Sequence, residues 1–548
     1  MSAVRHARLL PLLVLVLAAC GEPRAQDPTE PVVVETPQDG NALRQAAFAA
    51  QGRGDHAAAA DAFLSLSKLE PSEPNWVVRA GDNLGRAGRI DEAIDLLATT
   101  RKRFPDALAI QSMLARTYAL KADATRMTSG RDATVQLYYE DAVRTARAVL
   151  AIDAQDLDAR LVLASSLLEL GEAEAAFEEA TMAVAKAPRA YSTQALLGRI
   201  AYERFVAAQR SAAEAEGEAK SAATALAGTM RDAASAAFRA AAEAEPSRSF
   251  PKVALGDLLA WSGDLPGAAA RYGEALALDP WAKVNHDWLR SALGGKDRAE
   301  LYAKARTTYG AREGAKPSGL ALLGWYEAQA CFDQAGEAGT EATRRTELWK
   351  RAAELFGDTV DAMPEYVDTG WWLMQSRYWA GDLAGAIAAA TKFAQQNPRR
   401  FADMIRGDDD TIAVVVGLAA KEYQAGHIVG SRDLNQVIAY ARSTADDWNN
   451  YAFLCRETRA YRESLVGYER ALELEPESPQ LLNDCAVILQ YHLADDANLA
   501  RAKGMYERAI ELATAQLAAG GLAANRRELV STALRDARNN LAALERRR

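Results

Sequence analysis

The sequence is poor in the residues and motifs from which most catalytic and metal-binding sites are built. Its 548 residues include five histidines and four cysteines. It contains no HExxH or C-x-x-C motif, no G-x-x-x-x-G-K-[ST] phosphate-binding loop and no G-x-S-x-G turn. We therefore expect a protein that is not an enzyme, without catalytic residues, metal site or cofactor. A carboxylate pair among the 74 acidic residues would carry no recognisable motif, so an enzyme of that kind stays an alternative.

Basic stretches are also missing, apart from the final ERRR, which is too short to form a binding stripe. The net charge is −10, from 64 basic and 74 acidic residues, and the basic residues form no stripe along the chain. Proteins that bind nucleic acid concentrate Lys and Arg on one face, where these side chains contact the phosphates. The charge balance therefore argues against nucleic acid as a partner.

The sequence has no long apolar run. Its most apolar stretch is short and lies near the start of the sequence. Arg5 and Arg8 precede an apolar run from Leu9 to Ala19. This run is shorter than the about 20 residues that a membrane-spanning helix needs. A basic start followed by a short apolar run is typical of a secretory signal peptide.

The end of that run, the tetrapeptide LAAC that closes at Cys20, resembles the lipobox of bacterial lipoproteins. The resemblance implies that residues 1–19 are a signal peptide cleaved before Cys20, and that Cys20 carries a lipid. An ordinary signal peptide cleaved after Ala19 is the alternative. Residue 21 is Gly and not Asp, which by the enterobacterial sorting rule implies an outer-membrane anchor facing the periplasm. The expected location is thus the bacterial cell envelope.

Two stretches of equal length repeat the same phrase. "GDLPGAAARYGEALALDP" ends at Pro280, and "GDLAGAIAAATKFAQQNP" ends at Pro398. Closing prolines recur at a spacing of 34 residues, as in Pro246 and Pro280 or Pro364 and Pro398. An Ala and a large apolar residue precede each proline at fixed distances. Such a period indicates a stack of small structural units and not a single site.

This pattern resembles the tetratricopeptide repeat, in which small and large apolar residues alternate between two helices and a proline follows. The resemblance covers nearly all of the chain from Gly40 to Arg548. It implies an all-α superhelix, a solenoid of about nine or ten helix pairs. Residues such as Ala268, Tyr272 and Pro280 then belong to the core or end a helix.

Breaks in the period divide the chain into segments. After the signal peptide, residues 20–40 form a Pro-rich, acidic tether. We expect an N-terminal array over residues 41–280, with helical-hairpin insertions, and a C-terminal array with a capping helix over residues 317–548. An irregular connection, residues 281–316, separates the two arrays. Cys331, Cys455 and Cys485 are expected to be buried thiols, although Cys455 and Cys485 lie on adjacent units and could form a bridge.

Two sets of residues are candidate partner-binding sites. Trp261 and Trp379 occupy the same position of two units, at the end of the first helix, and Trp371 and Tyr378 lie close to Trp379 in the sequence. Asparagine pairs recur at one position of three C-terminal units, and we expect them to form a row that hydrogen-bonds a peptide backbone. The row consists of Asn449, Asn450, Asn483, Asp484, Asn539 and Asn540. Core packing of the Trp residues and an ordinary polar helix surface are the plainer alternatives.

The resemblance favours a non-catalytic scaffold that binds an unknown protein or peptide and is attached to the membrane by its lipid. A binder of a small ligand, such as a glycan or peptidoglycan fragment, through the Trp-rich middle is a second hypothesis. An enzyme that uses a carboxylate pair without a recognisable motif is the third hypothesis.

The lipid anchor gives a direct prediction. Replacing Cys20 by Ser should release the protein from the membrane fraction or leave the precursor uncleaved, because the thiol that carries the lipid is gone. Fractionation of lysed cells and mass spectrometry of the N-terminal peptide measure both outcomes. A wild-type protein that stays soluble and carries no lipid on Cys20 would contradict the prediction.

Overall fold

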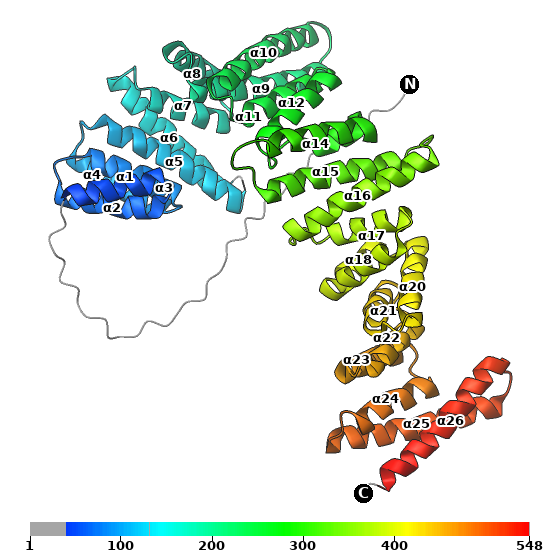
Figure 1. The fold of residues 1–548 in the computed structure, drawn as a ribbon. Coiled ribbons are helices and arrows are strands. Elements are labelled where there is room, and N and C mark those ends of the chain that lie inside the picture. The colour runs from blue at the N-terminus through cyan, green and yellow to red at the C-terminus, as the bar shows by residue number, and fades with distance from the viewer. Residues whose placement is uncertain (1–39, 131, 547–548) are drawn as a thin grey trace. The chain divides into compact units, whose positions relative to one another are not determined.

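The structure is a computed structural model, and it describes residues 40–130 and 132–546 (Figure 1). Cys20, the expected signal peptide and nearly all of the expected tether lie outside these residues. The described residues contain helices and no strand. They divide into two compact units, one ending at Glu172 and one beginning at Ala173, and each is described by itself.

The first unit contains seven helices. They are α1 (Gly40–Gly52), α2 (His56–Leu69), α3 (Asn75–Arg86), α4 (Ile90–Arg103), α5 (Leu108–Ser129), α6 (Ala133–Ile152) and α7 (Leu157–Glu169). The pairs α1–α2, α3–α4 and α5–α6 are each joined by a short turn, and every second helix packs on the first helix of the next pair.

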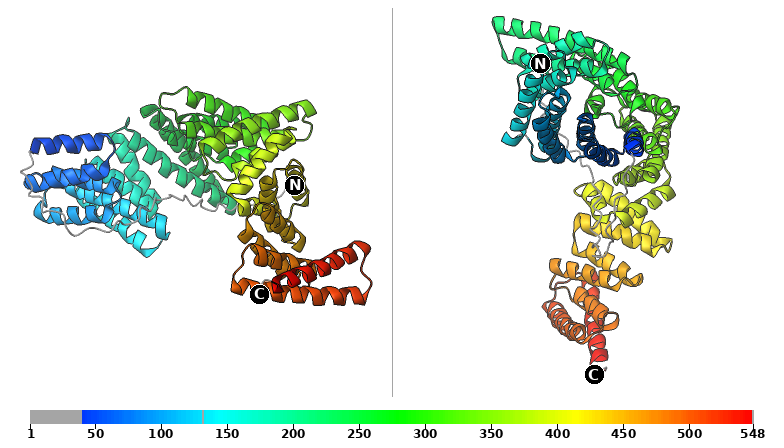
Figure 2. Two further views of the ribbon diagram at one scale, coloured as in Figure 1. Left: turned by 60° about the horizontal axis from the view of Figure 1, so that its bottom comes forward. Right: turned by 90° about the vertical axis from the view of Figure 1, so that its left-hand side faces the viewer.

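The second unit continues the same arrangement over a longer stretch (Figures 1 and 2). Its pairs are α9 (Tyr191–Glu214) with α10 (Gly217–Ala244), α11 (Phe250–Trp261) with α12 (Leu265–Leu278), α15 (Pro317–Gly336) with α16 (Ala342–Ala362), α17 (Thr369–Trp379) with α18 (Leu383–Gln396), α20 (Asp409–Gln424) with α21 (Ile428–Arg442), α22 (Ala445–Glu457) with α23 (Tyr461–Leu474), and α24 (Pro479–Tyr491) with α25 (Asp496–Ala519). The remaining helices are α8 (Ala173–Lys186), α13 (His286–Ala292), α14 (Gly295–Gly310), α19 (Pro398–Ile405) and α26 (Ala524–Glu545).

The fold class is therefore all-α, of the tetratricopeptide-like superhelix type that the repeat predicted. None of the helices in the described part of the chain is long and apolar enough to cross a membrane.

The repeated GDL phrase forms the turn within a pair. Gly263 and Gly381 have positive φ angles of 79° and 82°, which residues with a side chain rarely adopt. The Asp that follows caps the second helix: the Asp264 carboxylate accepts a hydrogen bond of 3.0 Å from the backbone N–H of Gly267. A Cβ atom on Gly267 would crowd that same carboxylate. Turn geometry thus explains the glycine at the Gly263 position, and cap geometry explains Asp264 and Gly267.

Close contact between a glycine on the first helix and a large side chain on the second helix holds several of the pairs together. A Cβ atom on Gly256 would lie 2.6 Å from the Tyr272 ring, and one on Gly198 would lie 2.6 Å from the Phe238 ring. Tyr272 and Phe238 are both fully buried. Real side chains do not approach so closely, so these positions admit only glycine at this spacing.

Several second-helix tyrosines also reach back to a polar group on their partner helix. The Tyr272 hydroxyl donates a hydrogen bond of 2.5 Å to the Asp257 carboxylate, and the Tyr139 hydroxyl donates one of 2.5 Å to Asp123. Burial raises the pKa of Asp257 to about 6, and the hydrogen bond from Tyr272 opposes this shift more weakly.

The irregular segments are helical and packed. The insertion after Ala190 lengthens both helices of the α9–α10 hairpin. Within residues 281–316, α13 has only seven residues, and α14 packs against both α12 and α15. The helix α26 packs on α24 and α25 near the C-terminus. The expected domain boundaries stay predictions, and the division into compact units falls elsewhere, after Glu172.

The three cysteines of the described residues are free and buried, so the conceivable bridge between Cys455 and Cys485 is not formed. Burial raises the pKa of the Cys485 thiol to about 12 and that of Cys331 to about 11. All three therefore behave as small apolar side chains.

The close contact within the helix pairs predicts that a Gly→Ala substitution changes the stability in opposite directions at two positions. Gly256→Ala should destabilise the protein by about 1–3 kcal/mol, because the new methyl group overlaps the rigid Tyr272 ring. Gly504→Ala, in an exposed part of α25 with no atom near the new methyl group, should instead stabilise it by about 0.5–1 kcal/mol. Denaturant unfolding followed by circular dichroism measures both. Equal effects of the two changes would contradict the packing argument.

The buried Asp257 predicts a pH dependence. Its pKa in the folded protein is about 6, above the ordinary value of 3.8, so the folded state binds this proton more tightly. Its contribution to stability therefore falls as the pH rises from about 4 to about 6. Relative to wild type, Asp257→Asn should gain about 1–3 kcal/mol in unfolding free energy between pH 4 and pH 7. A difference between the two proteins that does not change with pH would contradict this.

Candidate partner-binding grooves

The first helices α1, α3 and α5 of the first unit line a groove of about 820 Å³, here called the N-terminal groove. Its lining combines aromatic, apolar and charged side chains of both signs. The residues used below are Arg44, Phe48, Glu70, Trp76, Arg79, Asp82 and Arg116.

The N-terminal groove has an aromatic base. The buried Phe63 of α2 stacks on Trp76, with ring centroids 6.1 Å apart, and meets Phe48 edge-on at 5.5 Å. Phe48 is 44% exposed. The guanidinium of Arg79 lies 4.9 Å from the centroid of the Phe48 ring, a cation–π arrangement. The base thus presents an accessible aromatic ring with a cation held over it.

Most charges of the N-terminal groove are already paired. Glu70 accepts a hydrogen bond of 2.8 Å from the Trp76 indole and forms an ion pair with Arg44. Asp82 lies 3.5 Å from the Arg116 guanidinium. Arg79 is exposed and has no acidic partner among the described residues. Since a guanidinium offers a planar set of donors suited to a carboxylate, Arg79 is the position where an acidic group of a partner can bind.

A second groove, here called the C-terminal groove, lies between α20, α21 and α22 and has a volume of about 330 Å³. Tyr423, Asn435, Asn450 and Phe453 are among its lining residues. The Asn450 side chain is exposed and makes no hydrogen bond to any described residue, whereas Asn435 donates one of 2.8 Å to the Ser431 carbonyl. Asn450 is therefore free to hydrogen-bond a peptide backbone.

The structure separates the residues of the predicted asparagine row into groups with different surroundings. The Asn540 amide donates a hydrogen bond of 3.1 Å to the Asn483 carbonyl oxygen, and the Asn483 amide donates one of 3.2 Å to the Asp484 carboxylate. Burial raises the pKa of Asp484. These three residues join α24 to its neighbour α26 and largely satisfy one another. Asn450 lies instead in the C-terminal groove.

Asn449 and Asn539 complete the predicted row. Asn449 is half-buried and Asn539 is exposed, and neither makes a hydrogen bond to a described residue. Their part in partner binding stays a prediction.

The structure also separates the residues of the predicted tryptophan site, so that they do not surround one common cavity. Trp261 and Trp379 end the first helices α11 and α17, and they are 48% and 49% exposed. Trp261 meets Phe205 edge-on at 6.4 Å, whereas Trp379 lies 5.7 Å from Trp349. The two residues occupy equivalent positions on separate helix pairs.

The remaining two aromatic residues pack closer to the core. Trp371 is 9% exposed and packs edge-on against Phe401 at 5.8 Å. Tyr378 is half-buried beside Trp379, with ring centroids 5.3 Å apart. Trp371 therefore fills the core and offers a partner little surface.

Buried carboxylates elsewhere have structural partners. Glu327 accepts hydrogen bonds from Arg306 at 2.8 Å and from Arg351 at 3.0 Å, and Asp447 accepts one of 3.0 Å from Arg442. In the described part of the chain, no group of three or more His, Cys, Asp or Glu side chains could hold a metal ion. These carboxylates stabilise helix packing.

The motif search missed the N-terminal groove. A usable signal was present: Arg44 and Phe48 on one first helix, and Trp76 and Arg79 on the next, repeat an aromatic residue beside an arginine. The aromatic residues are spread over two helix pairs, so they form no dense tryptophan cluster in the sequence.

No protein-family model matches the sequence, and the search of curated proteins gave no match. Solved structures of tetratricopeptide repeat (TPR) proteins are similar in part. YrrB, described as a TPR protein with an unusual peptide-binding site, is 14% identical, with 41% of this chain and 95% of that chain covered and a TM-score of 0.28.

Two further structures give comparable values. A tetratricopeptide repeat protein from Parabacteroides merdae is 11% identical, with 62% of this chain and 98% of that chain covered and a TM-score of 0.30. The Cut9–Hcn1 hetero-tetramer of the APC/C matches at 11% identity, with 90% of this chain and 96% of that chain covered and a TM-score of 0.30. Similarity at this level carries no information about function.

Proposed function

We propose that this protein is a non-catalytic scaffold of the bacterial cell envelope that binds a protein or peptide segment in the grooves of its first helices. The observation that carries the proposal is the N-terminal groove, where the exposed Arg79 lies over Phe48 without an acidic partner among the described residues. An exposed aromatic ring beside an unpaired guanidinium is the combination enriched where proteins bind one another.

The chemistry of the groove defines the segment that fits it. An apolar or aromatic side chain can pack on Phe48 and Trp76, and a carboxylate can pair with Arg79. In the C-terminal groove, Asn450 can donate to and accept from a peptide backbone, which suits an extended segment of varied sequence. Two grooves on one chain allow the scaffold to hold two segments.

The anchoring and location rest on the sequence alone. The resemblance of LAAC at Cys20 to a lipobox supports a lipid anchor, and Gly21 supports the outer membrane facing the periplasm. The Pro-rich tether would then keep the helical units away from the lipid headgroups.

Glycan binding through the Trp-rich middle is less well supported. Such a site needs several accessible aromatic rings around one ligand. Trp371 is largely buried, and Trp261 and Trp379 contact different helices.

The proposed function predicts position-specific crosslinking in the native envelope. A photoreactive amino acid at Phe48, inside the N-terminal groove, should form a covalent adduct with a partner. The same amino acid at Ala49, the exposed next residue on α1, should form at least tenfold less. Immunoblotting and mass spectrometry of the adduct measure both.

Charge reversal at Arg79 provides the specificity control. Arg79→Glu should reduce the adduct at position 48 at least tenfold, because an acidic group of the partner loses its cation and meets a like charge. Arg147→Glu, at an exposed position of α6 in the same unit, should leave it unchanged. Circular dichroism checks that both variants keep their helices. Equal adducts at positions 48 and 49, or an adduct insensitive to Arg79→Glu, would refute the proposal.

A further inference from the structure

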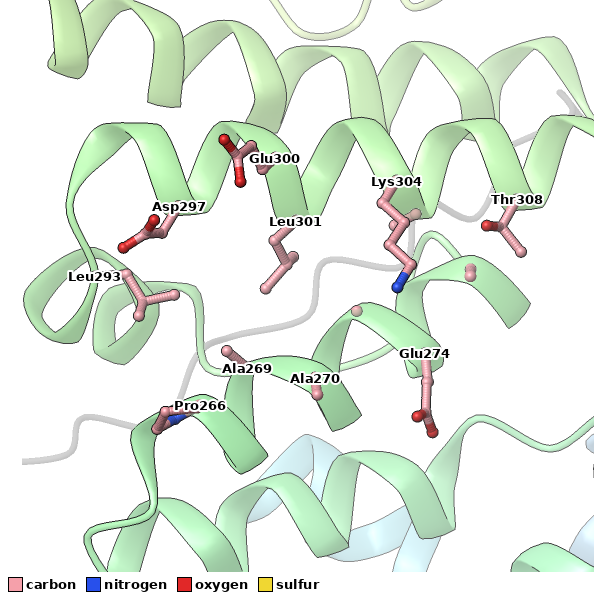
Figure 3. A pocket seen from close by; sticks show the side chains of 13 residues that line it. Pro266, Ala269, Ala270, Glu274, Leu293, Asp297, Glu300, Leu301, Lys304 and Thr308 are labelled. Atoms are coloured by element: carbon pink, nitrogen blue, oxygen red, sulfur yellow. The ribbon is translucent and has the colours of Figure 1, made fainter.

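The short helix α13 brings α12 and α14 into direct contact. In regular pairs of the second unit a second helix packs on the next full-length first helix, as α10 does on α11 and α16 does on α17. Here α13 has seven residues, too few to cover α12, and α14 packs on α12 in its place. Residue numbers increase in the same direction along both helices in Figure 3, so α12 and α14 run parallel.

A groove of about 540 Å³ lies between these two helices (Figure 3). Apart from Glu274, the α12 side is made of small residues on one helical face, among them Pro266, Ala269, Ala270 and Gly273. Leu301 of α14 lies opposite, and a Cβ atom on Gly273 would be 3.5 Å from it. Side chains at this i, i+3, i+4, i+7 spacing form a straight strip of small residues along α12. The α14 side is more polar, with Leu301 between charged side chains. The groove between the two helices is here called the channel.

The channel is open to solvent. Ala270 is exposed, and Ala269, Gly273 and Leu301 are half-buried. Small side chains on α12 let the backbone of an incoming helix approach closely, since the distance between packed helices depends on the side chains at their contact. The straight strip of small residues along α12 suits a third helix better than an extended strand, whose backbone hydrogen bonds would find no partner there.

Charged side chains line the rim in a fixed order. Asp297 and Glu300 stand on α14 at one end of the channel, and Lys304 stands on the same helix farther along, with Glu274 across from it on α12 (Figure 3). Asp297 has no basic partner among the described residues, whereas Glu300 forms a long ion pair of 4.0 Å with the Lys296 ammonium. Glu274 is paired with Arg271 at 2.8 Å. Two carboxylates against the single Lys296 ammonium leave the end near Asp297 and Glu300 net negative.

We infer that this channel is a second docking site, one that binds an amphipathic helix of a partner protein. The bound helix presents Ala- and Leu-sized side chains to the channel and places Lys or Arg against Asp297 and Glu300. Charge complementarity selects this occupant over an anionic lipid surface, which the two carboxylates would repel. The site lies on other helices than the N-terminal and C-terminal grooves, and the inference is independent of them.

The test uses the purified full chain and a designed, fluorescein-labelled helical peptide. The peptide carries Leu or Ala at i, i+3, i+4 and i+7 and two lysines beside that face at one end. One matched peptide has glutamates in place of the lysines, and another has the same composition in scrambled order. Fluorescence anisotropy measures the Kd of each.

The basic peptide should bind wild-type protein at least tenfold more tightly than the acidic or the scrambled peptide. The double variant Asp297→Lys with Glu300→Lys should reverse the preference, so that the acidic peptide binds more tightly. A control with the same change in net charge, Glu216→Lys with Glu218→Lys at the tip of the α9–α10 hairpin, should behave as wild type. Arg79→Glu should also leave the affinity unchanged, which separates this site from the N-terminal groove.

Three results would overturn the inference. These are equal binding of the scrambled peptide, no measurable binding of the basic peptide, and a preference that Asp297→Lys with Glu300→Lys does not alter. Binding of vesicles that contain anionic phosphatidylglycerol, abolished by filling the channel with Gly273→Leu, would assign the channel to lipid and would equally overturn it.

Discussion

The close approach of the two helices in each pair is the constraint on which the structure depends. Gly256 against Tyr272 and Gly198 against Phe238 bring two backbones together at a distance that no larger residue on the first helix allows. A pair packed in this way still has an apolar face on its outer side. It can bury that face only against the next pair, so the chain grows by stacking and needs no single large core.

Stacking of this kind frees one surface for function. The residues that hold a pair together point toward its second helix or toward the neighbouring pair, and in α1 and α3 the opposite face is left to line the N-terminal groove. The N-terminal groove illustrates this: Ala47 and Ala50 of α1 are buried in the core, whereas Arg44 and Phe48 on the same helix line the groove. Under the proposed function, changes at exposed groove positions such as Arg79 would therefore alter partner choice at little cost in stability.

Departures from the regular period create further surfaces. Because α13 is short, α14 packs directly on α12 and leaves a channel with acidic residues at one end. A regular array buries the corresponding face of a second helix under the next first helix. The same irregularity also places His286 in a half-buried aromatic stack with Tyr326, ring centroids 3.8 Å apart, where desolvation lowers the pKa of His286 to about 4. The ring is thus neutral and structural at physiological pH.

By itself, the sequence determined the fold class, the helix pairs and their turns. Repeat chemistry is local: Gly263, Asp264 and Gly267 specify a turn and a cap within five residues, and the 34-residue spacing follows from two helices of ordinary length. The sequence also placed Trp261 and Trp379 at equivalent helix ends. Only the tertiary structure decided that Trp371 is buried, that Asn483 and Asn540 bond to each other, and that Arg44, Phe48, Trp76 and Arg79 share one groove. The period gives a residue its place within a pair, but its exposure and its partners depend on the curvature of the stack and on side chains of neighbouring pairs, which no local pattern encodes.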